Sequence, residues 1–153
     1  MRVAVSADHA GHPLYEPVME ELRRLGHEAV GVNSGPPQLD DDYPDFSRLV
    51  GERVQRGDCQ RGVVVCGSGV GAAVAANKMP GIRAGLCHDT YSAHQGVEHD
   101  DMNVLCLGAK VVGSALALEL VGAFVSASFD HVERHQRRLD KVLKMEKAAH
   151  GSS

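Results

Sequence analysis

Short, β-branched apolar segments alternate along this chain with amphipathic stretches of helical length. The apolar segments predict strands at 2–7, 26–32, 61–67, 82–88 and 103–108. The stretches that follow them predict helices at 13–25, 44–57, 70–79, 90–98, 112–127 and 132–148. Strands that are apolar on both faces and alternate with helices form a parallel sheet that is covered on both sides. We therefore expect a three-layer α/β/α domain with a five-stranded, parallel, Rossmann-like sheet.

The length and composition limit the classes of partner. The 153 residues suffice for one domain, which we place at 1–150, followed by a flexible tail at 151–153. A net charge of −4 gives no basic field for nucleic acid, and no segment reaches the roughly 18 apolar residues of a membrane span. Without a secretory signal or C-x-x-C spacing, we expect a cytoplasmic protein with reduced thiols. Cys59 is predicted to lie in a loop, and Cys87 and Cys106 inside strands.

Polar and reactive side chains follow the predicted strands. The carboxyl ends of parallel strands meet at one edge of a sheet, where open α/β sheets bind their ligands. The acidic, proline-containing loop at 33–45 either borders this edge or is a solvated connection. The residues that follow the strands are Asp8, His9, Asn33, Ser34, Cys66, Gly67, Ser68, His88, Asp89, Gly108, Ala109 and Lys110.

The segment CGSGVGAAVA at 66–75 places a thiol and a glycine-rich loop at the start of a predicted helix. Backbone N–H groups and the helix dipole attract negative charge at such a position, so the occupant is a phosphate, a pyrophosphate or a reaction oxyanion. Cys66 there is either a nucleophile or base, or a small buried residue. A phosphocysteine mechanism would need an arginine that closes the loop, and because the chain has Ala72 we exclude that mechanism.

The same loop also fits a nucleotide site. Gly67, Gly69 and Ala72 match G-x-G-x-x-G/A, and Asp89 follows about 20 residues later, as a ribose-binding acid would. This fingerprint normally follows the first strand of a domain, whereas here it follows the third. A non-catalytic nucleotide-binding domain therefore stays as an alternative function.

Several other polar residues have both a functional and a structural interpretation. Asp8 either caps the first helix or acts in the site. His99, which lies between two acids, either exchanges protons near neutral pH or is a surface histidine. Arg134 and Arg138 share one helical face, which suits a phosphate dianion, unless they belong to a solvated helix. The Asp/His pairs lack the spacing of a preformed metal site, so we expect no metal.

Taken together, these residues resemble the ribose-5-phosphate isomerase B family, which also includes galactose-6-phosphate, allose-6-phosphate and tetrulose-phosphate isomerases. The resemblance implies a cofactor-independent aldose–ketose isomerisation of a phosphorylated sugar, with D-ribose 5-phosphate and D-ribulose 5-phosphate as the leading pair. It also implies a homodimer with active sites shared between subunits, in which the C-terminal helix reaches toward the partner subunit, and it leaves tetramers open. The motifs that carry it are DHAG at 8–11, DYP at 42–44, CGSGVG at 66–71, AANKMPGIRA at 75–84, YSA at 91–93, HDDMNVLCLGAKVVG at 99–113 and RHQRR at 134–138.

The resemblance also assigns roles to the site residues. Cys66 would be the base that moves a proton between C1 and C2, beside Ser68, which stands where the family more often has threonine. Asp8 and His99 would assist ring opening, with His99 supplied by the partner subunit, and Tyr43 would line the sugar site. The enediolate oxygen would be held by the backbone of Gly67, Gly69, Val70 and Gly71. The phosphate would be bound by His9, Arg134 and Arg138.

Two positions depart from the family pattern. Members that act on ribose 5-phosphate usually have asparagine where this chain has Asp100, and a carboxylate cannot donate the hydrogen bond of an amide. Lys110 stands where arginine is common, which keeps the charge but loses the bidentate fork. Both positions concern substrate binding. A tetrose or hexose phosphate isomerase, and a sensor of sugar phosphates without turnover, therefore stay as alternatives.

Overall fold

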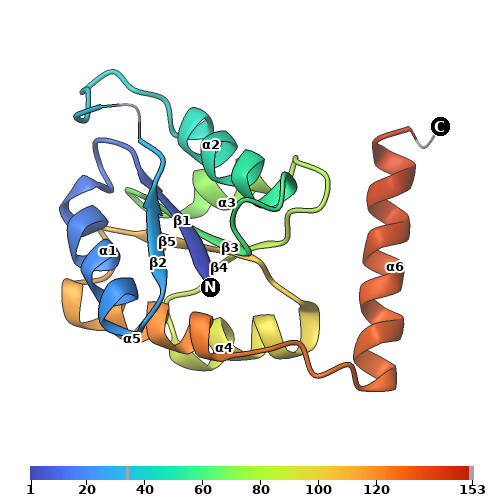
Figure 1. Ribbon diagram of the computed structural model, residues 1–153. Coiled ribbons are helices and arrows are strands. Elements are labelled where there is room, and N and C mark those ends of the chain that lie inside the picture. The colour runs from blue at the N-terminus through green and yellow to red at the C-terminus, as the bar shows by residue number, and fades with distance from the viewer. Residues whose placement is uncertain (34, 152–153) are drawn as a thin grey trace.

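A five-stranded parallel sheet forms the centre of the molecule (Figure 1). The structure, a computed structural model, describes residues 1–33 and 35–151, so Ser34 and residues 152–153 of the predicted tail lie outside the described residues. The strands are β1 (Arg2–Ala7), β2 (Glu28–Gly31), β3 (Arg61–Cys66), β4 (Ala84–Leu86) and β5 (Val104–Gly108). They lie in the order β2-β1-β3-β5-β4, and each pairing is parallel, which confirms the predicted sheet.

Helices cover both faces of this sheet, as Figure 1 shows. One face packs against α1 (Tyr15–Arg24), α4 (Thr90–Asp100) and α5 (Ser114–Ser126), and a short 3-10 turn at His12–Leu14 precedes α1. The other face packs against α2 (Tyr43–Gln55) and α3 (Val70–Ala76). The last helix is α6 (Glu133–Ala149). The predicted three-layer architecture is confirmed.

The central strands are apolar throughout because both of their faces are buried. Along β3, Val63 and Val65 belong to the core beneath α1, α4 and α5, whereas Val64 and Cys66 belong to the core beneath α2 and α3. Successive side chains of a strand point to opposite faces, so each strand contributes to both cores. Cys66 is therefore directed toward the α2 and α3 layer.

The edge strands are shorter than predicted. Gly26 has a φ of +88°, in the left-handed region that favours glycine, and the N–H of His27 donates to the carbonyl of Leu22. These residues terminate α1 instead of starting the strand that was predicted at 26–32. Cys87 likewise lies just past the end of β4, so its predicted place inside a strand is wrong.

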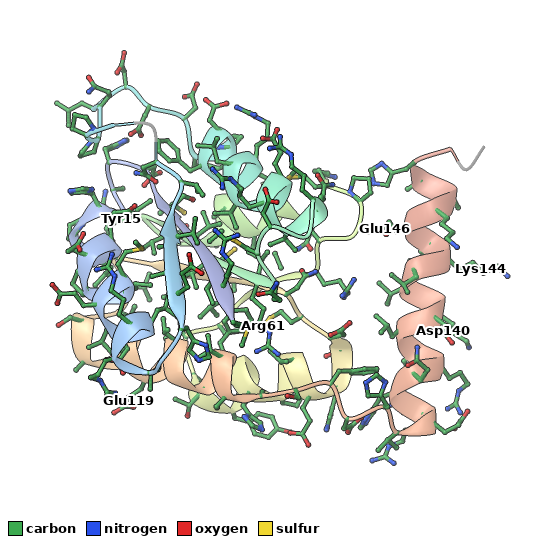
Figure 2. All side chains as sticks on the ribbon, in the orientation of Figure 1. Tyr15, Arg61, Glu119, Asp140, Lys144 and Glu146 are labelled. Carbon is green, nitrogen blue, oxygen red and sulfur yellow. The ribbon has the colours of Figure 1, made fainter. Side chains whose placement is uncertain are left out.

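A half-buried arginine joins the start of β3 to the end of α5. The Arg61 guanidinium donates hydrogen bonds of 2.6 Å to the carbonyl oxygens of Phe124 and Ala127, and it lies 5.5 Å from the centre of the Phe124 ring (Figure 2). The last carbonyls of a helix have no partner within the helix, so Arg61 supplies donors to the end of α5. Burial lowers the pKa of this guanidinium below its ordinary value, although the nearby charge of Asp101 opposes the shift.

The last helix stands apart from the rest of the molecule (Figure 1). Near its start it packs on α4 through the buried His135 and Leu139, and near its end Glu146 accepts a hydrogen bond of 2.9 Å from the N–H of Gly81. Between these contacts α6 and the β4 side of the sheet enclose a groove of about 720 Å³, into which Val142 and Met145 project. None of the described helices has the length and apolar character needed to cross a bilayer.

Candidate active site

Cys66 is the last residue of β3, and its sulfur faces the glycine loop that follows. The N–H of Gly69 donates a hydrogen bond of 3.1 Å to the Cys66 Sγ. Gly69 can do so because its φ of +82° turns the chain sharply into α3. The side chain is only 4% exposed, so the thiol lies beneath the loop. Ser68 is exposed above it, and its hydroxyl oxygen accepts the N–H of Val70 at 3.2 Å.

Two glycines outside the loop allow other segments to approach it closely. A Cβ on Gly108, at the end of β5, would lie 2.5 Å from the carbonyl carbon of Ser68. A Cβ on Gly11, after β1, would lie 2.1 Å from the carbonyl oxygen of Val65. Neither position accepts a side chain without movement of backbone atoms. The carboxyl ends of β1, β3 and β5 are thus packed directly against one another, as the sequence predicted.

Tyr43 and Lys110 flank the loop on two sides. A Cβ on Gly71 would lie 2.7 Å from the Tyr43 ring, so the ring packs on the backbone at the start of α3. The N–H of Lys110 donates to the carbonyl of Gly67 at 2.9 Å, and its side-chain methylenes lie beside the same glycine. Both side chains are exposed, which leaves the phenol and the ammonium group accessible.

Asp8 is buried next to this loop. Its Oδ1 accepts the N–H of Gly11 at 2.8 Å, and its own N–H donates to the carbonyl of Val65 at 3.3 Å. The carboxylate therefore holds the turn that leads into the first helical segment, as its structural interpretation proposed. Its part in chemistry remains a prediction.

His9 is held by a residue from the acidic loop. The Asp41 carboxylate lies 2.6 Å from the Nδ1 of His9 and accepts the backbone N–H of the same residue at 3.1 Å. Burial on its own would raise the pKa of Asp41, but hydrogen bonds from the His9 ring and from the backbone N–H groups of His9 and Gln38 keep this pKa below its ordinary value. Part of the loop at 33–45 thus borders the strand edge.

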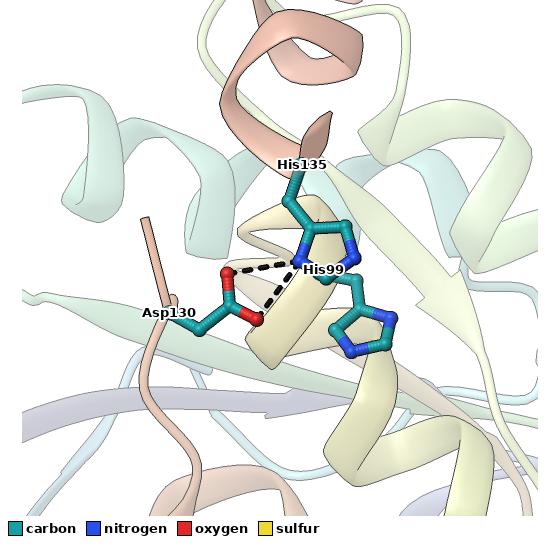
Figure 3. A group of neighbouring side chains, drawn as sticks. All are labelled: His99, Asp130 and His135. Atoms are coloured by element: carbon teal, nitrogen blue, oxygen red, sulfur yellow. Dashed lines mark hydrogen bonds and ion pairs between the residues drawn. The ribbon is translucent and has the colours of Figure 1, made fainter. Parts of the chain in front are cut away.

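A second group of predicted residues surrounds the junction of α4 and α6. His99 was predicted to lie in the segment that leads into β5, but it lies in the last turn of α4, which extends two residues beyond the predicted helix end at 98. Its ring stacks on that of His135 from α6, with 3.9 Å between the ring centres (Figure 3). This junction and the turn between β1 and α1 lie on different sides of the molecule in Figure 1. One chain therefore does not place His99 beside Cys66.

The two predicted phosphate-binding arginines belong to this second group. Arg134 and Arg138 are exposed on the first turns of α6, and among the described residues neither takes part in an ion pair. By contrast, Arg137 pairs with Glu133 at 2.8 Å. Asp100 is exposed at the end of α4 and lines the same groove as Arg138.

The other three cysteines are buried, Cys59 in a loop and Cys106 inside β5 as predicted, and Cys87 just past the end of β4. Burial raises the pKa of the Cys59 thiol, raises that of Cys87 to about 11, and raises that of Cys106 further. All four cysteines are free thiols. Cys66 differs from the others because a backbone N–H group points at its sulfur.

Three residues of these clusters were not identified from the sequence. Asp41 bonds the ring of His9, His135 stacks on His99, and Asp130 bonds His135. The only available signal was that His135 falls inside the RHQRR motif. The fold also gathers two Asp/His groups whose possible ligand atoms lie within 4.8 Å of one another, although their sequence spacing predicted no metal site. These groups are Asp8, His9 and Asp41, and His99, Asp130 and His135.

The acid invoked for nucleotide binding has another partner. The Oδ1 of Asp89 accepts the N–H of Ser92 at 2.6 Å and so caps the start of α4. The structure thus gives Asp89 a role as a helix cap that was not predicted from the sequence.

The fold and site define a class of protein: a three-layer α/β enzyme with a thiol and a carboxylate at the carboxyl edge of its sheet. The chain belongs to the ribose/galactose isomerase family, which it matches over residues 3–142, and it is an isomerase. Because the chain is an isomerase, the two non-catalytic alternatives, a nucleotide-binding domain and a sugar-phosphate sensor, no longer apply.

Solved structures and a curated relative are similar to this protein over most of its length. Ribose-5-phosphate isomerase B of Clostridium thermocellum superimposes with a TM-score of 0.92 and 40% identity, covering 97% of this chain and 99% of that one. The Mycoplasma genitalium enzyme with bound ribulose-5-phosphate has a TM-score of 0.89 and 35% identity, covering 95% and 96%. A D-erythrulose-4-phosphate isomerase of Pectobacterium atrosepticum is 35% identical, covering 85% of this chain and 86% of its own length.

Proposed function

We propose that this protein interconverts D-ribose 5-phosphate and D-ribulose 5-phosphate through an enediolate, with Cys66 as the base. The observation that carries the proposal is the sulfur at the end of β3, facing the N–H of Gly69 at the head of a glycine loop. The similarity to ribose-5-phosphate isomerases B, one of them solved with ribulose-5-phosphate, supports the choice of substrate.

The chemistry requires one base and a receptor for negative charge. Cys66 removes the proton from C2 of the open-chain aldose, and the electron pair moves onto the carbonyl oxygen at C1. The same sulfur returns the proton to C1, while a proton passes from the C2 hydroxyl to the oxygen on C1. The N–H groups in the first turn of α3 have no carbonyl partner within the helix, and since that of Val70 is taken by the Ser68 hydroxyl, the N–H of Gly71 is the donor we assign to the enediolate. One such donor contributes about 3–4 kcal/mol to the transition state.

The remaining roles require two copies of the chain. His99, Arg134 and Arg138 lie around the junction of α4 and α6, away from the carboxyl edge of the sheet (Figure 1). We place them in the site of a partner copy, where the arginines and the partner's own His9 bind phosphate and His99 assists ring opening. The apolar side chains Val142 and Met145, which are 49% and 72% exposed, give α6 a face for that second copy to cover.

The base assignment is tested with Cys66→Ala and Cys66→Ser variants. We expect both to lose about 10²–10⁴-fold in isomerisation and in exchange of the substrate C1 and C2 protons with deuterated water. Cys59→Ala is the matched control, because Cys59 is a buried thiol in a loop outside the site, and it should keep parental rates. Folded Cys66 variants that exchange protons as fast as the parent would contradict the proposal.

A tetrose phosphate is the second candidate substrate, favoured by the similarity to a D-erythrulose-4-phosphate isomerase. Asp100 and Lys110 are the positions where the chain departs from ribose 5-phosphate isomerases. Turnover of four-, five- and six-carbon sugar phosphates by the parent, Asp100→Asn and Lys110→Arg enzymes separates the candidates. Faster turnover of ribose 5-phosphate by the variants than by the parent would favour the shorter sugar as the native substrate.

A further inference from the structure

The half-buried Asp130 pairs with the buried His135 at the start of α6 (Figure 3). The Nδ1 of His135 lies 2.8 and 2.9 Å from the two carboxylate oxygens of Asp130, and the ring is 3% exposed. The N–H of Val132 also donates to Asp130, at 3.0 Å. Because both Asp130 oxygens contact the His135 ring and one of them also accepts the Val132 N–H, Asp130 fixes the orientation of that ring.

His99 is held between this ring and a residue of its own helix. The two imidazoles stack with 3.9 Å between their centres and 22° between their planes. On the other side, the Gln95 side-chain amide lies 3.0 Å from the Nδ1 of His99. Since Nδ1 is engaged by the amide, Nε2 is the nitrogen of His99 that is left for a substrate. The contacts therefore select both the plane of the ring and its reactive atom.

The same three residues do not have the arrangement of a metal site. Ligand nitrogens must converge on one point, whereas stacked rings present their nitrogens side by side in nearly parallel planes. The Asp130 oxygens are also both turned toward the Nδ1 of His135. The arrangement instead matches that of a histidine whose orientation is set by a neighbouring carboxylate and ring.

We propose that His135, anchored by Asp130, is a positioning residue that sets the orientation of His99 for ring opening of a cyclic sugar phosphate. This inference rests on the proposed function. In ring opening, the bond between C1 and the ring oxygen breaks, the ring oxygen gains a proton, and the C1 hydroxyl loses one. The Nε2 of His99 takes part in one of these two transfers. A misoriented ring would slow this step alone, because the later proton transfer depends on Cys66.

The test compares a cyclic substrate with an acyclic one. Ribose 5-phosphate is mostly a furanose, whereas ribulose 5-phosphate cannot close to a furanose because its C5 oxygen carries the phosphate. We expect Asp130→Asn and His135→Phe to lose up to about 10²-fold in turnover of ribose 5-phosphate, as misplacement of a catalytic group does. Deuterium uptake at C1 of ribulose 5-phosphate should stay within about twofold of the parental rate, because enediolate formation needs no ring opening.

Matched variants separate positioning from stability. Glu133→Gln breaks an exposed ion pair on the same turn of α6 and should leave both rates unchanged. Gln95→Leu removes the contact on the other side of His99 without touching α6, so it tests the inference even where His135→Phe unfolds. An equal loss of turnover and exchange, or no loss of either, would overturn the inference. A parent enzyme that exchanges no proton would instead overturn the proposed function.

Discussion

Imidazole–carboxylate pairs occur twice among the residues of the two site groups. Asp41 lies 2.6 Å from the ring of His9, and Asp130 lies 2.8 Å from that of His135. In both pairs the carboxylate comes from a loop and also accepts a backbone N–H, so the loop and the ring fix each other. A carboxylate with this many donors favours its charged form.

The Asp41 pair predicts a pH-dependent contribution to stability. Asp41→Asn should lower the free energy of unfolding by about 1 kcal/mol at pH 7, because hydrogen bonds to the charged carboxylate are lost. The pKa of Asp41 is lower in the folded protein than its ordinary value of 3.8, so its contribution is complete above that value. It disappears as the pH falls through the folded pKa, where the parent also becomes uncharged.

Urea unfolding at several pH values measures the difference in the free energy of unfolding between the parent and Asp41→Asn. Asp40→Asn is the control, because Asp40 is the exposed neighbour of Asp41 on the same loop, and it should change little at any pH. A difference between parent and Asp41→Asn that stays constant from pH 7 down to the lowest pH at which the protein remains folded would show that the effect is not electrostatic.

At the scale of elements, short segments at the carboxyl edge are held by longer-range contacts. The seven-residue α3 begins at a left-handed glycine and carries no side-chain cap, so its position depends on the packing of β5 and Tyr43 against its loop. On the opposite face of the sheet, the end of α5 depends on Arg61, whose guanidinium supplies donors to its last carbonyl groups.

Arg61→Met is expected to destabilise the fold by about 2–3 kcal/mol, because two carbonyl groups lose a charged donor and are left unpaired. Arg48→Met is the control, since Arg48 forms an exposed i, i+4 pair with Glu52, and such pairs contribute about 0.3–0.5 kcal/mol. Denaturant midpoints of the two variants should therefore differ clearly. Equal midpoints would mean that water replaces the arginine at the end of α5.

The sequence predicted elements better than contacts between them. The continuous valines of 63–65 and the glycines after Cys66 specify a buried strand and a tight turn locally, and both are confirmed. The stacking of His99 on His135 was not predictable, because it depends on the direction in which α6 leaves α5. The left-handed Gly26 was read as part of a strand because its role as a helix terminator depends on its backbone angles.

At the scale of the whole molecule, the residues of one proposed site lie in two separate groups on one chain. The first group surrounds Cys66, and the second surrounds the start of α6. A two-fold symmetric dimer offers the same surface twice, so it can join the first group of each copy to the second group of the other. The exposed apolar face of α6 agrees with such a contact.

Mixed dimers test this arrangement. Cys66→Ser and Arg138→Ala chains should each be nearly inactive alone. After joint unfolding and refolding, half of the dimers are mixed, and each mixed dimer has one site without either substitution. We expect activity to return to about one quarter of the parental value if sites are shared. The double variant refolded with itself is the control, and no recovery in the mixture would mean that each site is built from one chain.

The close backbone packing at Gly11 and Gly108 affects how the substrate preference of this enzyme can change. A carbon added at Gly108 or Gly11 would lie 2.5 or 2.1 Å from backbone atoms of β3 and its loop, so mutation there disturbs the frame that carries the thiol. Asp100, where the chain departs from the family pattern, is exposed at the end of α4 and carries no such constraint. New sugar preferences can therefore evolve at the periphery while the atoms that move the proton stay where they are.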